Sequence, residues 1–340
     1  MSLQSFKAGL AAVVVFGVMA AGAAVAQDNA LPEKVPDGVK IVLADDANNA
    51  ASLLRLSGEF DKLAADVSFA NFTSGPLRLE AIRAGAAQVG AVGDVPPILA
   101  QFSGAGVVIV GAVVTSGPGN LITTSPKSGI KELADLKGKK VGVNVGTAQQ
   151  ATLLRNLKAA GLTIKDIQPV NLGLAEFADA LRAEQIHAAV LKQPDRTRYL
   201  LSVDGQGAIE IPNAPGANTN IKYLYASKTA LADPAQAAAI RDLVIHWYRA
   251  HLWKNRNQEV WTQEYFIRNQ RLNEDDARLA AESEGDNTTI PGLQALVPVQ
   301  QETVDLLQAA GQFAGKKLDA REQFDLRFAD LNDRSRAQND

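Results

Sequence analysis

The chain has 340 residues, of which 46% are hydrophobic and 21% are charged. These are the proportions of a globular protein, and the length allows more than one domain. The net charge of −3 excludes a basic surface that would attract nucleic acid, and the absence of cysteine excludes disulfides, thiolate nucleophiles and cysteine-based metal sites.

The N-terminal segment is typical of a secretory signal peptide. Lys7 precedes an apolar, small-residue stretch over Ala8–Ala24, and an A-x-A pattern ends at Ala26. A membrane anchor is the alternative, but this stretch is shorter than the roughly 20 residues that a spanning helix needs. We therefore predict that residues 1–26 are removed and that the mature protein is exported to the periplasm.

After the signal segment, apolar strand patterns alternate with helical patterns. The first series consists of strands over 39–46, 67–72, 87–93 and 107–114, with helices over 48–66, 73–85 and 96–104 between them. This alternation predicts βαβ units with parallel strands, and therefore an α/β fold.

A stretch rich in Ser, Thr, Pro, Lys and Gly, residues 120–130, separates this series from a second one. The second series consists of a short helix and a strand over 130–144, a helix over 146–161, a strand over 167–172, a helix over 174–186 and a strand over 187–194. The last third of the chain is mainly helical in pattern, with a long helix over 234–266, broken near Asn255, and a helical tail over 300–340. Two α/β series predict two lobes.

A strand, a short polar turn and a helix start follow one another repeatedly. This arrangement occurs at Phe72–Leu77, Val92–Pro97, Val145–Gln150 and Leu191–Arg196. Helix N-termini expose unpaired N–H groups, so several that face one cleft would bind an anionic group without a metal. Ordinary helix capping explains any single turn, but their recurrence after strands matches the place where α/β folds bind ligands.

Other chemical signatures are missing from the sequence. It contains no G-x-S-x-G, Walker A loop or complete G-x-G-x-x-G motif. His246 and His251 are five residues apart, whereas two zinc ligands on one helical face need a spacing of four, and His187 stands alone. The aromatic residues Trp247, Tyr248 and Trp253 are typical of core or lobe-interface packing. No metal or other cofactor is expected.

Two stretches together resemble a known family. These are SGPLRLEAIRAGAAQVGAVGDVPPILAQ, residues 74–101, and IKELADLKGKKVGVNVGTAQQATLLRNLKAAGL, residues 130–162. They resemble the periplasmic solute-binding proteins of nitrate/sulfonate/taurine ABC importers, most of all the aliphatic-sulfonate branch. The resemblance extends over Val39–Tyr225, whereas the last third of the chain resembles the family only in its helical pattern.

The resemblance implies a type II periplasmic-binding-protein fold, with a ligand cleft between two lobes that are each a mostly parallel sheet flanked by helices. It implies crossings between the lobes near Thr123–Gly129 and Asn218–Lys222. We therefore predict one lobe from residues 27–125 and 223–340, which the C-terminal helices complete, and a second lobe from residues 126–222.

The resemblance also places candidate ligand-binding residues in the recurring turns. These are Ser74 and Gly75 in the first turn, Gly93, Asp94 and Val95 in the second, Gly146, Thr147 and Gln149 in the third, Lys192 and Gln193 in the fourth, and Asn218, with Asn220, at the return crossing. For Asp94 we favour helix capping over ligand contact, because a bare carboxylate repels an anion. Loop roles explain the two asparagines equally well.

One departure from the family bears on the ligand. Where the family commonly has an aromatic residue, an acid and a proline, this chain has Lys192 and Gln193 before Pro194. The loss of the acid disfavours taurine, whose amine would use it, and the added cation suits a more anionic or more polar ligand.

These observations predict the substrate-binding component of an ABC importer, a monomer that captures a small sulfonate-like anion and delivers it to a permease. An enzyme on the same scaffold, with Asp94 or Lys192 as the acid–base group, is the main alternative. No partner base or nucleophile accompanies either residue in the sequence, so we predict that the protein is not an enzyme. A receptor that feeds a sensor is a third possibility.

Overall fold

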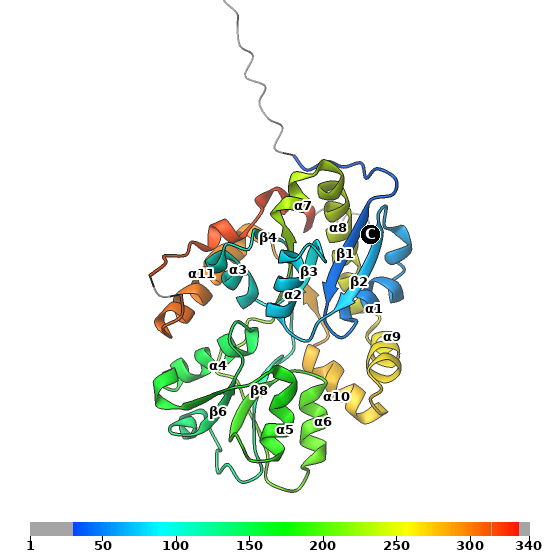
Figure 1. The fold of residues 1–340 in the computed structure, drawn as a ribbon. Helices are drawn as coiled ribbons and strands as arrows, with labels where there is room; N and C mark the ends of the chain where they lie inside the picture. The colour runs from blue at the N-terminus through cyan, green and yellow to red at the C-terminus, as the bar shows by residue number, and fades with distance from the viewer. Residues whose placement is uncertain (1–29, 314, 333–340) are drawn as a thin grey trace, which may run out of the picture. The chain divides into compact units, whose positions relative to one another are not determined.

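The computed structural model describes residues 30–313 and 315–332, so the predicted signal peptide, residues 1–26, lies outside the described residues. A compact unit begins at Leu31 and contains two β-sheets (Figure 1). We call the part of the chain built on the first sheet lobe 1 and the part built on the second sheet lobe 2.

The first sheet has the strand order β11-β4-β10-β3-β1-β2 and the second has the order β7-β6-β8-β5-β9. The strands of the first are β1 (Lys40–Asp45), β2 (Asp66–Asn71), β3 (Val89–Val92), β4 (Val107–Thr115), β10 (Ile221–Ser227) and β11 (Thr288–Thr289). Those of the second are β5 (Leu121–Thr124), β6 (Lys140–Val143), β7 (Gln168–Asn171), β8 (Ala188–Leu191) and β9 (Glu210–Ile211).

The prediction of an α/β fold is confirmed, and both sheets are mixed. β1 pairs in parallel with β2 and β3, whereas β10 runs antiparallel to both β3 and β4. β6 pairs in parallel with β7 and β8, whereas β5 runs antiparallel to β8 and β9. β5 and β10 are the strands by which the chain enters each sheet from the other lobe, and they therefore run against their neighbours.

The two crossings lie between β4 and β5 and between β9 and β10. The first precedes the predicted Thr123–Gly129, because Leu121–Thr124 already pairs with β8 in the second sheet. The second ends at Ile221, where β10 begins. The residue bounds of the two lobes otherwise stay a prediction.

Helices surround both sheets (Figure 1). They are α1 (Asn49–Leu56), α2 (Gly75–Arg83), α3 (Val95–Ser103), α4 (Ala148–Ala159), α5 (Phe177–Arg182), α6 (Asp195–Ser202), α7 (Lys228–Ala232), α8 (Pro234–Arg256), α9 (Gln258–Trp261), a π-helix (Thr262–Asn269), α10 (Glu274–Glu284) and α11 (Leu293–Ala309). Short 3-10 helices occupy Phe60–Lys62, Leu133–Leu136, Ile164–Asp166, Leu174–Glu176, Ala320–Gln323 and Leu326–Phe328. No helix among the described residues is long and apolar enough to span a membrane.

The helical last third differs from its prediction in detail. The long helix breaks at Asn257, close to the expected position, and continues as α9 and the π-helix. Of the predicted helical tail, α11 ends at Ala309, and the described residues beyond it include two short 3-10 helices.

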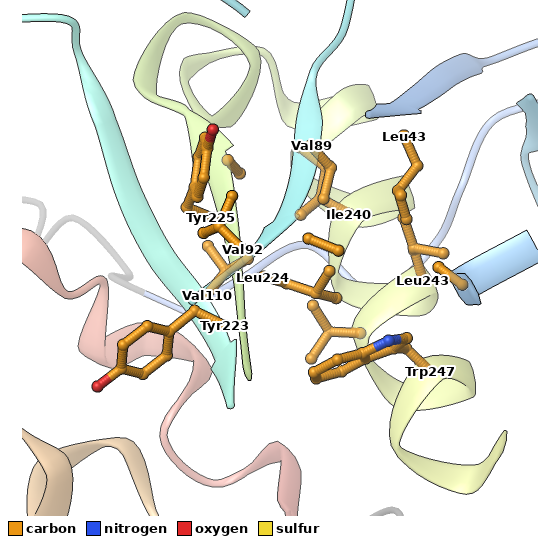
Figure 2. Packing of buried hydrophobic residues seen from close by; sticks show 14 of the residues in the cluster. Leu43, Val89, Val92, Val110, Tyr223, Leu224, Tyr225, Ile240, Leu243 and Trp247 are labelled. Carbon is orange, nitrogen blue, oxygen red and sulfur yellow. The ribbon is translucent and has the colours of Figure 1, made fainter. Parts of the chain in front are cut away.

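Lobe 1 has the larger hydrophobic core, and α8 covers one face of its sheet. Apolar residues recur along α8 at the spacing of one helical face, and Ile240, Leu243 and Trp247 are all buried. Figure 2 shows these side chains beside Leu43 of β1 and Leu224 of β10, in the same buried cluster. The core therefore ties the C-terminal third of the chain to the N-terminal strands.

Replacement of Trp247 by Ala tests this arrangement. The Trp247 side chain is 1% exposed, so its removal leaves a large cavity, and we expect a loss of about 3–5 kcal/mol in the free energy of unfolding, measured with urea. Leu279 on α10 is 44% exposed and serves as the control, because Leu279→Ala should change stability by no more than about 0.5 kcal/mol. Equal effects of the two substitutions would contradict this description of the core.

Candidate functional site

A cavity of about 250 Å³ lies between the two lobes. Residues at the carboxyl ends of β1, β3 and β8 and at the first turns of α2 and α4 line it, as do residues of both crossings. This is where α/β folds place ligands. Most of the predicted ligand-binding residues line this one cavity: Ser74, Gly75, Gly93, Thr147, Gln149, Lys192, Gln193 and Asn218. Their contact with a ligand stays a prediction.

The start of α2 presents a positively polarised surface to the cavity. Ser74 is the N-cap residue, but its side chain makes no capping hydrogen bond, so the N–H groups of Gly75 and Leu77 lack a side-chain acceptor there, and Pro76 between them has no N–H. One turn into the helix, Arg78 also lines the cavity and is only 6% exposed. Its Nη1 donates to Phe72 O at 2.7 Å, while its Nε–H has no hydrogen-bond partner in the structure. A buried guanidinium donor without a partner is costly unless a ligand supplies the acceptor.

Position 93 requires a glycine because the two lobes approach each other closely there. A Cβ atom at this position would lie 2.7 Å from Cβ of Ala148, the first residue of α4 in lobe 2. Both positions must therefore stay small for the cavity to keep this width. Ala148 therefore has a packing role at this contact.

Several polar side chains of the third and fourth turns form hydrogen bonds with other groups of the protein itself. Thr147 Oγ1 donates to Asn144 O at 2.7 Å and accepts from the N–H of Gln150. Gln193 Oε1 accepts from Oγ1 of Thr197 at 2.9 Å. These groups shape the turns, and a ligand at this side of the cavity would meet the remaining donors of Gln149 and Gln193.

Three predicted residues do not line the cavity: Asp94, Val95 and Gly146. Val95 is fully buried in the hydrophobic cluster of lobe 2, because α3 packs its first turn against that lobe. Gly146 adopts a positive φ of 83° in the turn before α4, and its N–H donates to Gln150 Oε1. These two residues shape the surroundings of the site from outside the cavity.

Asp94 has a role that the sequence did not indicate. Its side chain makes no helix-capping hydrogen bond, so the predicted capping role is wrong. Instead its carboxylate accepts from Arg155 Nη2 at 2.8 Å and from Thr219 Oγ1 at 3.2 Å. Arg155 belongs to α4 of lobe 2 and also donates to Thr303 of α11. Asp94 therefore joins lobe 1 to lobe 2 behind the cavity.

Two carboxylates in the cavity are held ionised by neighbouring cations. Burial opposes the ionisation of Asp46, but the Lys192 ammonium at 2.7 Å and the Arg78 guanidinium at 3.7 Å outweigh it and lower the pKa of Asp46. Burial likewise opposes ionisation of Glu284, and Lys254 at 2.8 Å, together with Lys222, keeps its pKa below the ordinary value. Lys192 points into the cavity, and its partner is a carboxylate of the other lobe.

Several cavity residues escaped the sequence analysis: Asp45, Asp46, Arg78, Lys222, Lys254, Tyr265 and Glu284. Arg78 could have been predicted from the sequence as a cavity residue. It stands three residues after Gly75, one turn from a helix start that the sequence analysis identified. The last four come from β10 and the helical third, where no motif marked them. Tyr265 of the π-helix also lines the cavity, and its ring stacks on Trp261 with 4.2 Å between the ring centroids.

The histidines lie outside the cavity and form structural contacts. His187 Nδ1 accepts from Lys140 N at 3.0 Å, His246 contacts Glu59 at 2.6 Å, and His251 packs edge-on against Trp247. Across residues 30–313 and 315–332, no group of three or more His, Cys, Asp or Glu side chains could hold a metal ion.

Part of the chain is similar in sequence to known proteins. The family profile described as NMT1/THI5 like matches residues 64–206. Over 145 residues the chain is 37% identical to a protein of Escherichia coli (strain K12) named for the binding of aliphatic sulfonates, a match that covers 43% of this chain and 44% of that protein. The matched region thus spans less than half the length of this curated relative.

Solved structures extend the likeness to most of the chain. The periplasmic aliphatic sulphonate binding protein SsuA from Escherichia coli superimposes with a TM-score of 0.72 at 26% identity, covering 87% of this chain and 99% of that one. The alkanesulfonate-binding protein SsuA from Xanthomonas axonopodis pv. citri, bound to MOPS, superimposes with a TM-score of 0.74 at 23% identity. This match covers 86% of this chain and 99% of that one. The predicted resemblance to sulfonate-type solute-binding proteins is therefore confirmed, as is the periplasmic-binding-protein fold.

The same fold also occurs in an enzyme. The desulfurization enzyme DSZB superimposes with a TM-score of 0.62 at 15% identity, covering 89% of this chain and all of that one. At this identity the likeness shows the fold alone, so catalysis has to be judged from the residues of the cavity.

The contact between Asp94 and Arg155 can be tested by a double-mutant cycle. Asp94→Asn leaves Arg155 without its carboxylate at a buried position, and we expect a loss of about 2–3 kcal/mol in the free energy of unfolding. In the Arg155→Met background the same substitution should cost much less, since the pair is already broken. Additive effects of the two substitutions would show that the pair does not join the lobes energetically.

Proposed function

We propose that this protein is the substrate-binding component of an ABC importer and that it captures a small organic anion, a sulfonate or a close analogue. It would act in the periplasm as a monomer after removal of residues 1–26 and would deliver the anion to a permease in the inner membrane. The fold and the sulfonate-binding relatives support the class of protein. The permease, the export step and the oligomeric state rest on the family resemblance.

The observation that carries the ligand class is the environment of Arg78. The guanidinium-bearing side chain of Arg78 lies one turn from the uncapped start of α2, and Ser74, Gly75 and Arg78 all line the same small cavity. An arginine and a helix N-terminus together form a strong binding site for a negatively charged oxygen group. A sulfonate presents three acceptor oxygens and one negative charge, which suits several converging N–H donors.

Binding would couple to movement of the lobes. A solute that contacts both α2 of lobe 1 and the turns of lobe 2 favours the closed arrangement by differential affinity, while the two crossing segments serve as hinges. The ligand would then be released to the permease when the lobes open.

We propose binding rather than catalysis for this cavity. The acid–base candidates from the sequence are both engaged: Asp94 pairs with Arg155 outside the cavity, and Lys192 pairs with Asp46. A bound sulfonate should be recovered chemically unchanged after long incubation with the protein. Turnover of the sulfonate would instead favour an enzyme on this scaffold.

The experiment that tests this proposal is calorimetric titration with ethanesulfonate. The wild-type protein should bind it with one site per chain. Arg78→Gln should weaken binding about 10- to 100-fold, which corresponds to about 1.5–3 kcal/mol for hydrogen bonds to a charged group. Arg83→Gln is the matched control, since Arg83 stands on the same helix, is exposed and pairs with Glu80. Failure of the wild-type protein to bind any small organic anion would contradict the proposal.

A further inference from the structure

The charges that line the cavity do not balance. Four cationic side chains and three carboxylates face it: Arg78, Lys192, Lys222 and Lys254 against Asp45, Asp46 and Glu284. One positive charge is therefore left without a negative partner. A cavity between two packed lobes favours a guest that removes such an imbalance.

Each of the three carboxylates is already satisfied by the protein itself. Asp46 accepts from Lys192 and Glu284 accepts from Lys254. Asp45 accepts the N–H groups of Asp46, Ala50 and Ala51, at 2.7–3.0 Å, and so caps the start of α1. No carboxylate in this set is left to receive an ammonium group of a ligand.

Lys222 is the cation in this cavity that lacks a carboxylate partner. It stands at the second position of β10, the strand between β3 and β4. Its Nζ donates to Asn49 Oδ1 at 2.8 Å, and within the described parts of the chain no carboxylate oxygen lies within 4.0 Å of it. A neutral amide oxygen satisfies one of its three N–H donors and none of its charge.

We propose that Lys222 is the residue that neutralises the ligand's charge and that it makes the cavity selective for solutes with one negative charge and no ammonium group. This inference rests on the proposed function, since it assigns the charge of the solute bound at that same site. Arg78 and the start of α2 would orient the anionic oxygens, while Lys222 sets the net charge that the cavity accepts.

The surroundings of Lys222 predict that the affinity for an anion depends on pH. Burial, and to a lesser extent Lys254, lowers the pKa of Lys222 although Glu284, Asp45 and Asp46 oppose the shift. The other charged or titratable groups that face the cavity or contact this cluster are Arg78, Lys192, Tyr265 and the buried His251. An anion binds the protonated form, so affinity should fall as pH rises through the pKa of Lys222, which lies below the ordinary 10.5 of lysine.

The test compares the wild-type protein with Lys222→Met and Lys222→Arg by titration with ethanesulfonate and taurine. At pH 7 we expect the wild type to prefer ethanesulfonate, and Lys222→Met to lose about 10- to 100-fold of that affinity. Lys222→Arg should retain affinity to within about tenfold. As the pH rises through the pKa of Lys222, the ethanesulfonate affinity of the wild type should fall, whereas that of Lys222→Arg should stay nearly constant because arginine remains protonated.

The outcomes separate the two proposals. Unchanged ethanesulfonate affinity in Lys222→Met, or equal affinity of the wild type for taurine, would overturn this inference and leave the proposed function standing. No binding of ethanesulfonate, taurine or any other small organic anion by the wild type would overturn both. If Lys222→Met fails to fold, the pH profile of Lys222→Arg decides the question, and a fall as steep as that of the wild type would overturn the role of Lys222.

Discussion

The free-energy cost of burying charged side chains determines which residues pair at the centre of this protein. Lysine, arginine and carboxylate side chains are buried only at a cost unless oppositely charged or hydrogen-bonding groups lie beside them. Seven such charged side chains line the cavity between the lobes. Two lysines are matched by carboxylates of the same chain, and Asp45 is matched by backbone N–H groups. Arg78 keeps an unused donor and Lys222 keeps an unmatched charge. We propose that the ligand supplies the negative charge that this set of side chains lacks.

The same charges help to join the lobes. Lys192 of lobe 2 pairs with Asp46 of lobe 1 across the cavity, and Arg155 of lobe 2 pairs with Asp94 of lobe 1 behind it. The close contact of Gly93 with Ala148 lies beside these pairs. The two lobes are thus in contact both at the cavity and away from it. For a solute to enter, the pair at the cavity must separate, whereas the strand connections through β5 and β10 persist.

The sequence predicted the fold well where local pattern decides it, and poorly where distant segments meet. Alternating apolar strands and capped helices indicated an α/β fold, and the turns at Ser74, Gly93 and Lys192 do converge on one cavity. The strands β5 and β10 were not predicted, because residues 120–130 have the composition of a linker and no motif marks Ile221–Ser227. Lys222, Lys254 and Glu284 were missed because each is an isolated charged residue in a helical or strand pattern that surface exposure explains equally well. Asp94 was misread, since its partner Arg155 stands 61 residues away.

The most direct test of the central claim is a crystal structure with 2-bromoethanesulfonate, in which the anomalous signal of bromine locates the ligand. The account predicts one bromine site in the cavity between the lobes, with sulfonate oxygens within hydrogen-bond distance of Arg78 and of the first N–H groups of α2. A fully occupied ligand elsewhere on the protein, with the cavity unchanged and Arg78 Nε still without an acceptor, would contradict it.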